Sequence, residues 1–140
     1  MSTLYATDTT TTSTTTPGLG SVLLTGSVAT VAAAVATAAV AAAGQAIGIT
    51  TEVGGAPIPT SGFAVLTAIF AIVGLVIATG IRRFARRPRT AWLRTTVALT
   101  VLSFVPDLLV DAAVPTKMLL MATHVVAAAI VIPAVARTLA

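Results

Sequence analysis

Four long apolar stretches constrain this chain more than any other feature of its sequence. They cover residues 19–47, 63–81, 92–110 and 117–135, and each is near the length that crosses the hydrocarbon core of a bilayer, about 20 residues. Charged residues make up 9% of the 140 residues, against about 25% in a soluble domain. Because lipid offers the backbone no hydrogen-bond partners, the sequence predicts an all-α bundle of four transmembrane helices spanning residues 19–140.

The orientation of the bundle is predicted from its arginines. Six of the eight basic residues lie between Arg82 and Arg94, and basic residues in short loops stay on the cytoplasmic side. The loop arginines are Arg82, Arg83, Arg86, Arg87 and Arg89. Four spans then place both termini and Arg137 in the cytoplasm, so we expect a multi-pass protein of the plasma membrane. Binding of anionic lipid headgroups by these arginines is an open alternative. Nucleic-acid binding is not indicated, because the sequence lacks a basic surface with interspersed aromatic residues.

Residues 1–18 form a separate segment. Nine of the first sixteen residues are threonine, and such a sequence cannot bury enough apolar area to fold. It also lacks the basic region of a secretory signal peptide. We therefore expect a disordered tail that is not cleaved.

Small residues dominate the first span. Alanine, together with Ser27, Thr30 and Thr37, lets helix backbones approach closely in lipid, so we expect this helix in the interior of the bundle. The GxxxG spacing from Gly44 to Gly48 fits close packing within one chain better than a dimer face. Gln45 is expected to bond a neighbouring helix.

The remaining spans are separated by turn sequences. Residues 48–62 form a loop punctuated by glycine and proline, and Trp92 suits a membrane interface. Hydroxyl side chains are plausible N-caps for the later helices. The candidates are Thr60 or Ser61, Thr90 and Thr116.

A polar cluster near the end of the third span is the main candidate for function. Hydroxyls and carboxylates follow one another at spacings of three or four residues, which places them on one face of a helix. They are Thr96, Thr100, Ser103, Asp107 and Asp111. The only histidine, His124, follows in the fourth span, just after Lys117. Charged groups at such depth are costly and need partners.

Depth along the helices predicts which residues pair. Asp107 lies about 22 Å along the helix axis from Trp92, and His124 lies about 10 Å past Lys117. In an antiparallel hairpin these two reach a similar depth, so Asp107 should pair with His124. Asp111 and Lys117 should form a second, shallower pair.

Two interpretations of the cluster remain open. The pairs either pin the outer end of the hairpin, in a structural or interaction role, or Asp107 and His124 form the protonation site of a small proton-coupled transporter or permeation element. The first is favoured. A cavity reaching Asp107 would support transport, whereas a dry and mutually satisfied pair would support structure.

Other classes of function are disfavoured by the residues present. The chain has no cysteine, and the spacing of its histidine and carboxylates matches no metal motif. No nucleophile–base constellation, phosphate loop or dinucleotide fingerprint occurs. We therefore predict a protein that is not an enzyme and binds no cofactor. Its expected partners are the bilayer and either another membrane protein or a second copy of itself.

The hairpin formed by the third and fourth spans resembles a known family. The resemblance rests on Ser103 to Pro106, on Thr116-Lys117, on the run from Met121 to Val126, and on Ile132-Pro133 with Arg137. With the arginine loop it covers about residues 21–137. The family comprises small four-helix integral membrane proteins of unknown function, found mainly in actinobacteria, some of which carry names such as cell-envelope biogenesis or OmpA-like protein. The resemblance implies the four-helix topology and no biochemical activity. Nothing in this sequence alternates like a barrel strand.

The predicted topology can be tested with single cysteines in this cysteine-free chain. A cysteine at Glu52 and one at Ala85 should react with a membrane-impermeant thiol reagent from opposite sides, Ala85 from the cytoplasm, because the arginine loop is retained inside. Labelling of both positions from one side would rule out this arrangement of spans.

Overall fold

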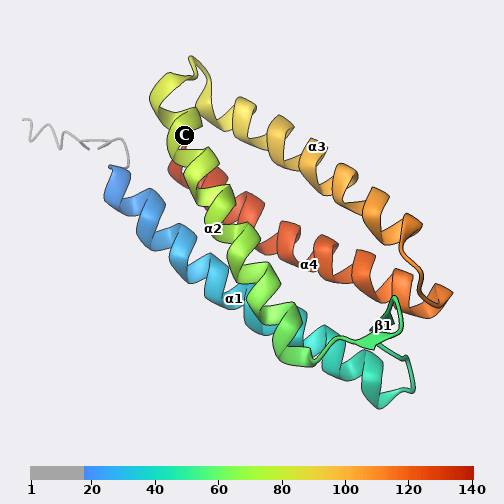
Figure 1. The fold of residues 1–140 in the computed structure, drawn as a ribbon. Helices are drawn as coiled ribbons and strands as arrows, with labels where there is room; N and C mark the ends of the chain where they lie inside the picture. The colour runs from blue at the N-terminus through green and yellow to red at the C-terminus, as the bar shows by residue number, and fades with distance from the viewer. Residues whose placement is uncertain (1–17) are drawn as a thin grey trace, which may run out of the picture.

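The computed structural model describes residues 18–140, which form four helices packed together in alternating directions (Figure 1). The helices are α1 (Leu19–Ala46), α2 (Thr60–Phe84), α3 (Pro88–Leu109) and α4 (Val114–Thr138). Each is long and apolar enough to span a membrane. The all-α, four-helix prediction is therefore confirmed for this part of the chain. The predicted tail lies outside the described residues except for Gly18.

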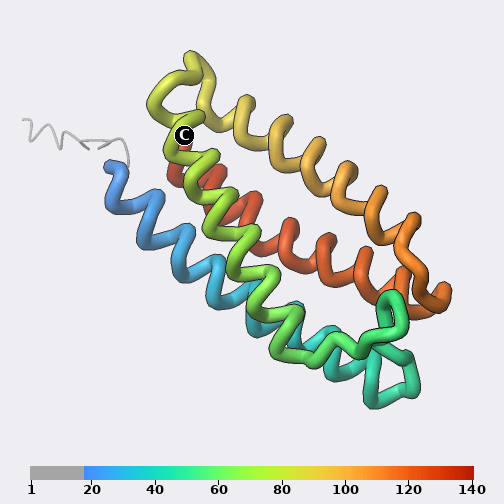
Figure 2. Tube along the Cα trace, viewed as in Figure 1, coloured from blue at the N-terminus to red at the C-terminus, as the bar shows by residue number. Residues whose placement is uncertain are grey.

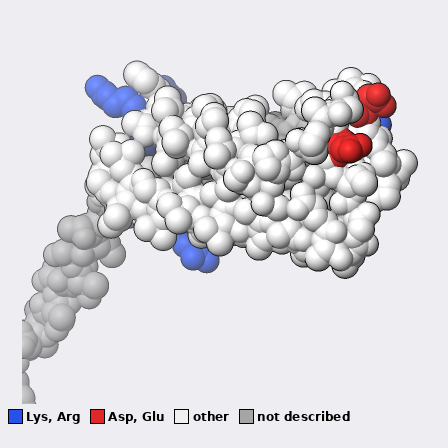
Figure 3. Space-filling view, turned by 60° about the horizontal axis from the view of Figure 1, so that its bottom comes forward, with Lys and Arg blue, Asp and Glu red and all other residues white. Residues whose placement is uncertain are grey.

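Connections and charges separate between the two ends of the bundle. The start of α1, the α2–α3 connection and the C-terminus lie at one end, and the α1–α2 and α3–α4 connections lie at the other (Figures 1 and 2). On the face shown in Figure 3, acidic side chains gather at one end and most basic ones lie away from it. The cytoplasmic location of the arginine end remains a prediction.

The connection between α1 and α2 contains a small hairpin that the sequence did not predict. Strands β1 (Glu52–Val53) and β2 (Ala56–Pro57) pair antiparallel, with Glu52 opposite Pro57. The turn between them uses Gly54 at φ 59° and Gly55 at φ 78°. Two consecutive residues with positive φ are typical of a tight hairpin turn and favour glycine at both positions.

Small residues allow α1 to pack against both α2 and α4. A Cβ atom at Gly26 would clash with a methyl carbon of Leu75 in α2, and one at Gly44 would lie 2.9 Å from Leu119 in α4. The close backbone packing expected of this helix is thus present on one side of it. Gly44 of the GxxxG spacing packs within the chain, while Gly48 lies beyond the helix in the loop.

Trp92, which the sequence suggests for a membrane interface, is buried in the protein core near the start of α3. Its side chain is 1% exposed, and Nε1 donates to the carbonyl oxygen of Ile132 in α4 at 3.0 Å. It packs with a buried cluster drawn from all four helices, including Val22, Leu75 and Val135. An indole can be buried when its N–H finds an acceptor, and α4 supplies that acceptor here.

The predicted hydroxyl N-caps are wrong. The N-cap positions of α2, α3 and α4 are Pro59, Arg87 and Ala113, none with a capping side-chain bond. Prolines at the first helical turns of α3 and α4 explain the earlier starts, because proline is preorganised for that position. Thr116 instead donates to the carbonyl of Thr50.

Loop and end contacts complete the fold. Gln45 Nε2 donates to Thr51 Oγ1 at 2.9 Å. Gln45 was expected to bond a neighbouring helix, but its partner lies in the adjoining loop. At the opposite end, the Arg82 guanidinium donates to the carbonyls of Gly18 and Thr138. This arginine therefore joins the first and last helices of the bundle.

The close approach of α1 to α2 yields a stability prediction. Gly26→Ala should destabilise the bundle by about 1–3 kcal/mol, because the added methyl displaces the buried Leu75 side chain. Gly80→Ala is the matched control, since nothing lies within 4 Å of a Cβ there. Thermal unfolding in one detergent measures both. Equal stability of the two variants would contradict the close approach.

Candidate functional site

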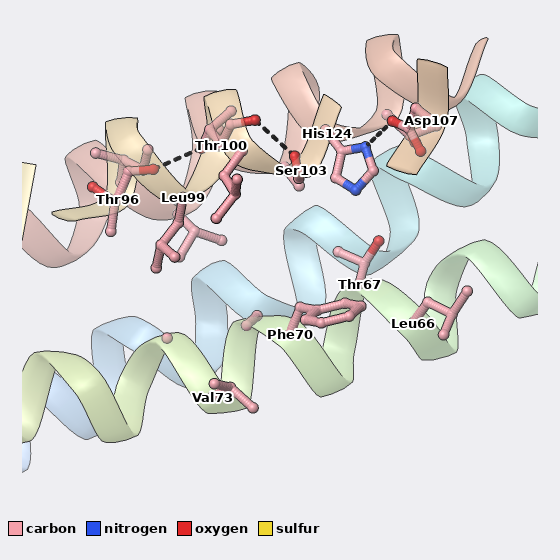
Figure 4. Close-up of a pocket in the computed structure, with 18 of the residues that line it drawn as sticks. Leu66, Thr67, Phe70, Val73, Thr96, Leu99, Thr100, Ser103, Asp107 and His124 are labelled. Carbon is pink, nitrogen blue, oxygen red and sulfur yellow. Dashed lines mark hydrogen bonds and ion pairs between the residues drawn. The ribbon is translucent and has the colours of Figure 1, made fainter. Parts of the chain in front are cut away.

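A groove of about 840 Å³ lies between α2 on one side and α3 with α4 on the other. We call it the intramembrane groove. Its α2 wall is apolar apart from Thr67. Its α3 wall carries four members of the predicted cluster, which we call the polar stripe: Thr96, Thr100, Ser103 and Asp107 (Figure 4). The lining residues labelled in Figure 4 are Leu66, Thr67, Phe70, Val73, Thr96, Leu99, Thr100, Ser103, Asp107 and His124. The groove therefore runs along the helices and reaches the predicted cluster.

Asp107 and His124 lie in contact on the wall of the groove. Oδ2 of Asp107, on α3, is 2.9 Å from Nδ1 of His124, on α4. The side chain of Asp107 is 10% exposed, whereas that of His124 is 36% exposed. The contact expected from helix depth is present. Whether the pair is a functional site remains a prediction.

The imidazole faces two oxygen acceptors through one nitrogen. Nδ1 of His124 lies 3.1 Å from the carbonyl oxygen of Leu120 as well as 2.9 Å from Asp107 Oδ2. A bare Nδ1 would direct its lone pair at both oxygens, so the geometry favours a proton on Nδ1. Oδ2 is buried and receives no well-aligned hydrogen bond. Nδ1 of His124 thus attracts Oδ2 of Asp107 electrostatically, but the hydrogen bond between them is poorly aligned.

The second ring nitrogen of His124 faces the groove. In Figure 4 the nitrogen that is not joined to Asp107 points away from α3, toward the α2 side. The ring of Phe104 lies edge-on to the imidazole, with centroids 6.4 Å apart and planes at 71°. This contact, together with Asp107, holds the imidazole in place.

The hydroxyls of the polar stripe are satisfied within their own helix. Thr96 donates to the carbonyl of Trp92 at 2.8 Å, Thr100 to that of Thr96 at 2.9 Å, and Ser103 to that of Thr100 at 2.7 Å. Such back-bonding is common for serine and threonine in helices. The stripe therefore offers no free hydroxyl donor, and Ser103 lies beside the Asp107–His124 pair without bonding it.

The second predicted pair is not formed. α3 ends at Leu109, so Asp111 lies in the following turn and not on the helical face that the spacing indicated. Lys117 Nζ donates to the carbonyl of Leu108 at 2.8 Å, and no ion pair joins it to Asp111 in the described part of the chain. Unpaired carbonyls at a helix C-terminus attract cations. The Leu108 carbonyl, near the end of α3, is therefore the partner of Lys117 in place of the Asp111 carboxylate.

The arginines occupy the opposite end of the bundle. Arg83 lies over the ring of Phe84, 5.9 Å from its centroid. Arg86 and Arg87 fall between α2 and α3, and Arg89 falls in the first turn of α3. A role for them in binding lipid headgroups stays a prediction.

The α2 wall was not anticipated. Phe63, Thr67 and Phe70 line the groove, but α2 is apolar on most of its faces and its sequence gives no sign of which face meets the groove. Within residues 18–140, no three histidine, cysteine or acidic side chains are grouped so that they could hold a metal ion.

Comparison with known proteins identifies one family. A family model described as "Family of unknown function (DUF6069)" matches residues 17–140. No curated protein and no solved structure matches the chain.

The pair predicts unequal effects of two matched substitutions. Asp107→Asn should destabilise the protein by about 1.5–3 kcal/mol, because it removes a charged partner from a buried contact. Asp111→Asn, in the exposed turn, should cost about 0–1 kcal/mol. Thermal unfolding in one detergent compares them.

The double change Asp107→Asn with His124→Gln tests the contact itself. It should cost clearly less than the sum of the two single changes, because residues in contact are not additive. Strict additivity would show that the two side chains do not interact.

Proposed function

The chain belongs to this DUF6069 family of unknown function, and we propose that it is a non-enzymatic, proton-coupled transporter or permeation element of the membrane. Asp107 and His124 are its titrating groups. The observation that supports this proposal is that the pair lines a groove of about 840 Å³ instead of being sealed between α3 and α4. A purely structural pair has no need of such a cavity beside it.

The proton-carrying step is located on His124. With Nδ1 protonated toward Asp107 and Leu120, Nε2 is free to gain or lose a proton from the groove. When Nε2 carries a proton, the imidazolium and the carboxylate sum to zero charge. When it does not, the pair carries one negative charge, which is costly at this depth. The site therefore favours replacing the lost proton by another positive charge.

No other ionisable group competes with the pair inside the groove. Asp107 and His124 are the titratable members of its lining, and the α2 wall facing them contributes Thr67 as its polar residue. The Thr67 hydroxyl lies 2.9 Å from that of Thr37 in α1. Glu52 and Asp111 lie in the connections between helices, Lys117 lies near the start of α4, and none of the three lines the groove.

Two features support the proposal that the protein is not an enzyme. Acyl and phosphoryl transfer need a nucleophile beside a base, and the groove hydroxyls nearest the pair are bonded to helix carbonyls. The lining is otherwise mostly aliphatic and aromatic. Binding and movement of a molecule fit these walls better than bond chemistry.

The location of the protein is part of the proposal. We place it in the plasma membrane with the arginine end in the cytoplasm, because basic residues cluster at the α2–α3 connection. The pair would then lie nearer the outer surface. Anionic lipid headgroups are the proposed partners of the exposed arginines.

A structural or interaction role is the second candidate. Two observations favour it. The pair provides a contact between α3 and α4, and the hydroxyls of α3 bond carbonyls of their own helix. In that case the pair would stabilise the hairpin and would not exchange protons during function.

The single histidine permits a direct test. In protein labelled with ¹⁵N-histidine in lipid nanodiscs, the ring signals of His124 should change reversibly with pH, because Nε2 exchanges protons with the groove. Asp111→Asn should leave this change intact, and Asp107→Asn should alter it. Ring signals that stay fixed over the whole pH range would support the structural role instead.

A further inference from the structure

We infer that the intramembrane groove binds a lipophilic organic cation and exchanges it for the proton on Nε2 of His124, an inference that rests on the proposed function. It names the class of molecule that the site would take. Three independent features of the groove lead to it: a buried anion, an apolar lining and the charge balance of the pair.

The buried anion is Asp107. Its Oδ2 is buried and lacks a well-aligned hydrogen bond, although the side chain lines the groove. The nearest positive group is His124, which is half-buried and can lose its charge. A carboxylate in this position attracts a second cation whenever the imidazole is neutral.

The lining selects for an apolar cation. Leu66, Phe70 and Val73 of α2 line the groove. An aromatic face such as that of Phe70 attracts organic cations, and the attraction is stronger where water is excluded. A volume of about 840 Å³ lies within the range of small-molecule sites, about 300–1,000 Å³. A hydrated metal ion would find almost no oxygen ligands on these walls.

Charge balance couples the two occupants. In the proton-loaded state, an imidazolium and a carboxylate give zero net charge. In the cation-loaded state, a neutral imidazole, the carboxylate and the bound cation again give zero. Binding of one cation therefore releases the Nε2 proton to water, and neither state leaves an uncompensated charge in lipid.

An anion does not fit this site. None of the lining residues is lysine or arginine, so the only positive group is the imidazolium that Asp107 already neutralises. An anion would add an unpaired negative charge to a low-dielectric groove.

The rim indicates that the cation comes from the bilayer. Leu66, Val73 and Leu102 line the groove and are each about half exposed or more, so in a membrane their outer surfaces meet lipid chains. A lipophilic cation already partitioned into the bilayer can thus reach Asp107 laterally between α2 and α3.

Two probe ions of matched size and opposite charge test the inference. Tetraphenylphosphonium should bind the protein in nanodiscs, above the background of empty nanodiscs, with release of about one proton per ion into weakly buffered solution. Tetraphenylborate should bind no better than to empty nanodiscs. The ring ¹⁵N signals of His124 should move to their neutral positions when tetraphenylphosphonium binds.

Three variants locate the site. Asp107→Asn should weaken tetraphenylphosphonium binding by more than about tenfold, because a buried charge partner is lost, while the matched Asp111→Asn should bind as wild type does. Leu99→Trp narrows the groove without touching the pair. This variant should reduce tetraphenylphosphonium binding but keep the pH response of His124. It tests the site even if Asp107→Asn does not fold.

The outcomes separate the inference from the proposed function. Equal binding of both ions, binding without proton release, or binding unaffected by Asp107→Asn and Leu99→Trp would overturn cation exchange. If tetraphenylphosphonium does not bind while His124 still responds to pH, the cation inference fails and the proposed function stands. If His124 does not respond to pH at all, both fail.

Discussion

The contact between Asp107 and His124 is the interaction on which the site depends. A carboxylate in the membrane-spanning part of a helix is expensive to keep ionised, and here it is buried with the imidazole 2.9 Å away. The histidine cannot turn aside freely, because Nδ1 also faces the Leu120 carbonyl and Phe104 lies edge-on to the ring. The pair joins α3 to α4 and leaves its second nitrogen toward the groove.

The groove itself follows from unequal packing of the helices. Glycine and alanine bring α1 close to both α2 and α4, whereas α3 packs mainly against α4. Buried Trp92 joins α3 to the core near the arginine end. Along the rest of its length α3 stands apart from α2, and the space between them is lined by large apolar side chains. The small residues of α1 thus draw α2 and α4 toward α1, and an opening remains beside α3.

Helix length and depth could be predicted from the sequence, but lateral packing could not. Four apolar stretches predicted the all-α bundle. Similar estimated depths along the two helices predicted that Asp107 lies opposite His124, and the two are in contact. Asp111 was misplaced because helical spacing was extended past the end of α3, where Lys117 instead binds a free carbonyl. The burial of Trp92 could not be predicted, because composition does not show which residues find acceptors inside. The α2 wall carried no signal, since a helix surrounded by apolar surface does not reveal which face meets a cavity.

Contact of His124 with water in a bilayer is the measurement that tests the central claim most directly. Solid-state NMR can follow magnetisation transfer from water to the ring protons of this single histidine. If the pair exchanges protons with the groove, the Nε2 proton should receive water magnetisation readily, and Leu99→Trp should slow the transfer. Absence of any transfer to the ring, while the exposed Lys117 amine receives it, would show a sealed structural pair and contradict the proton-coupled function.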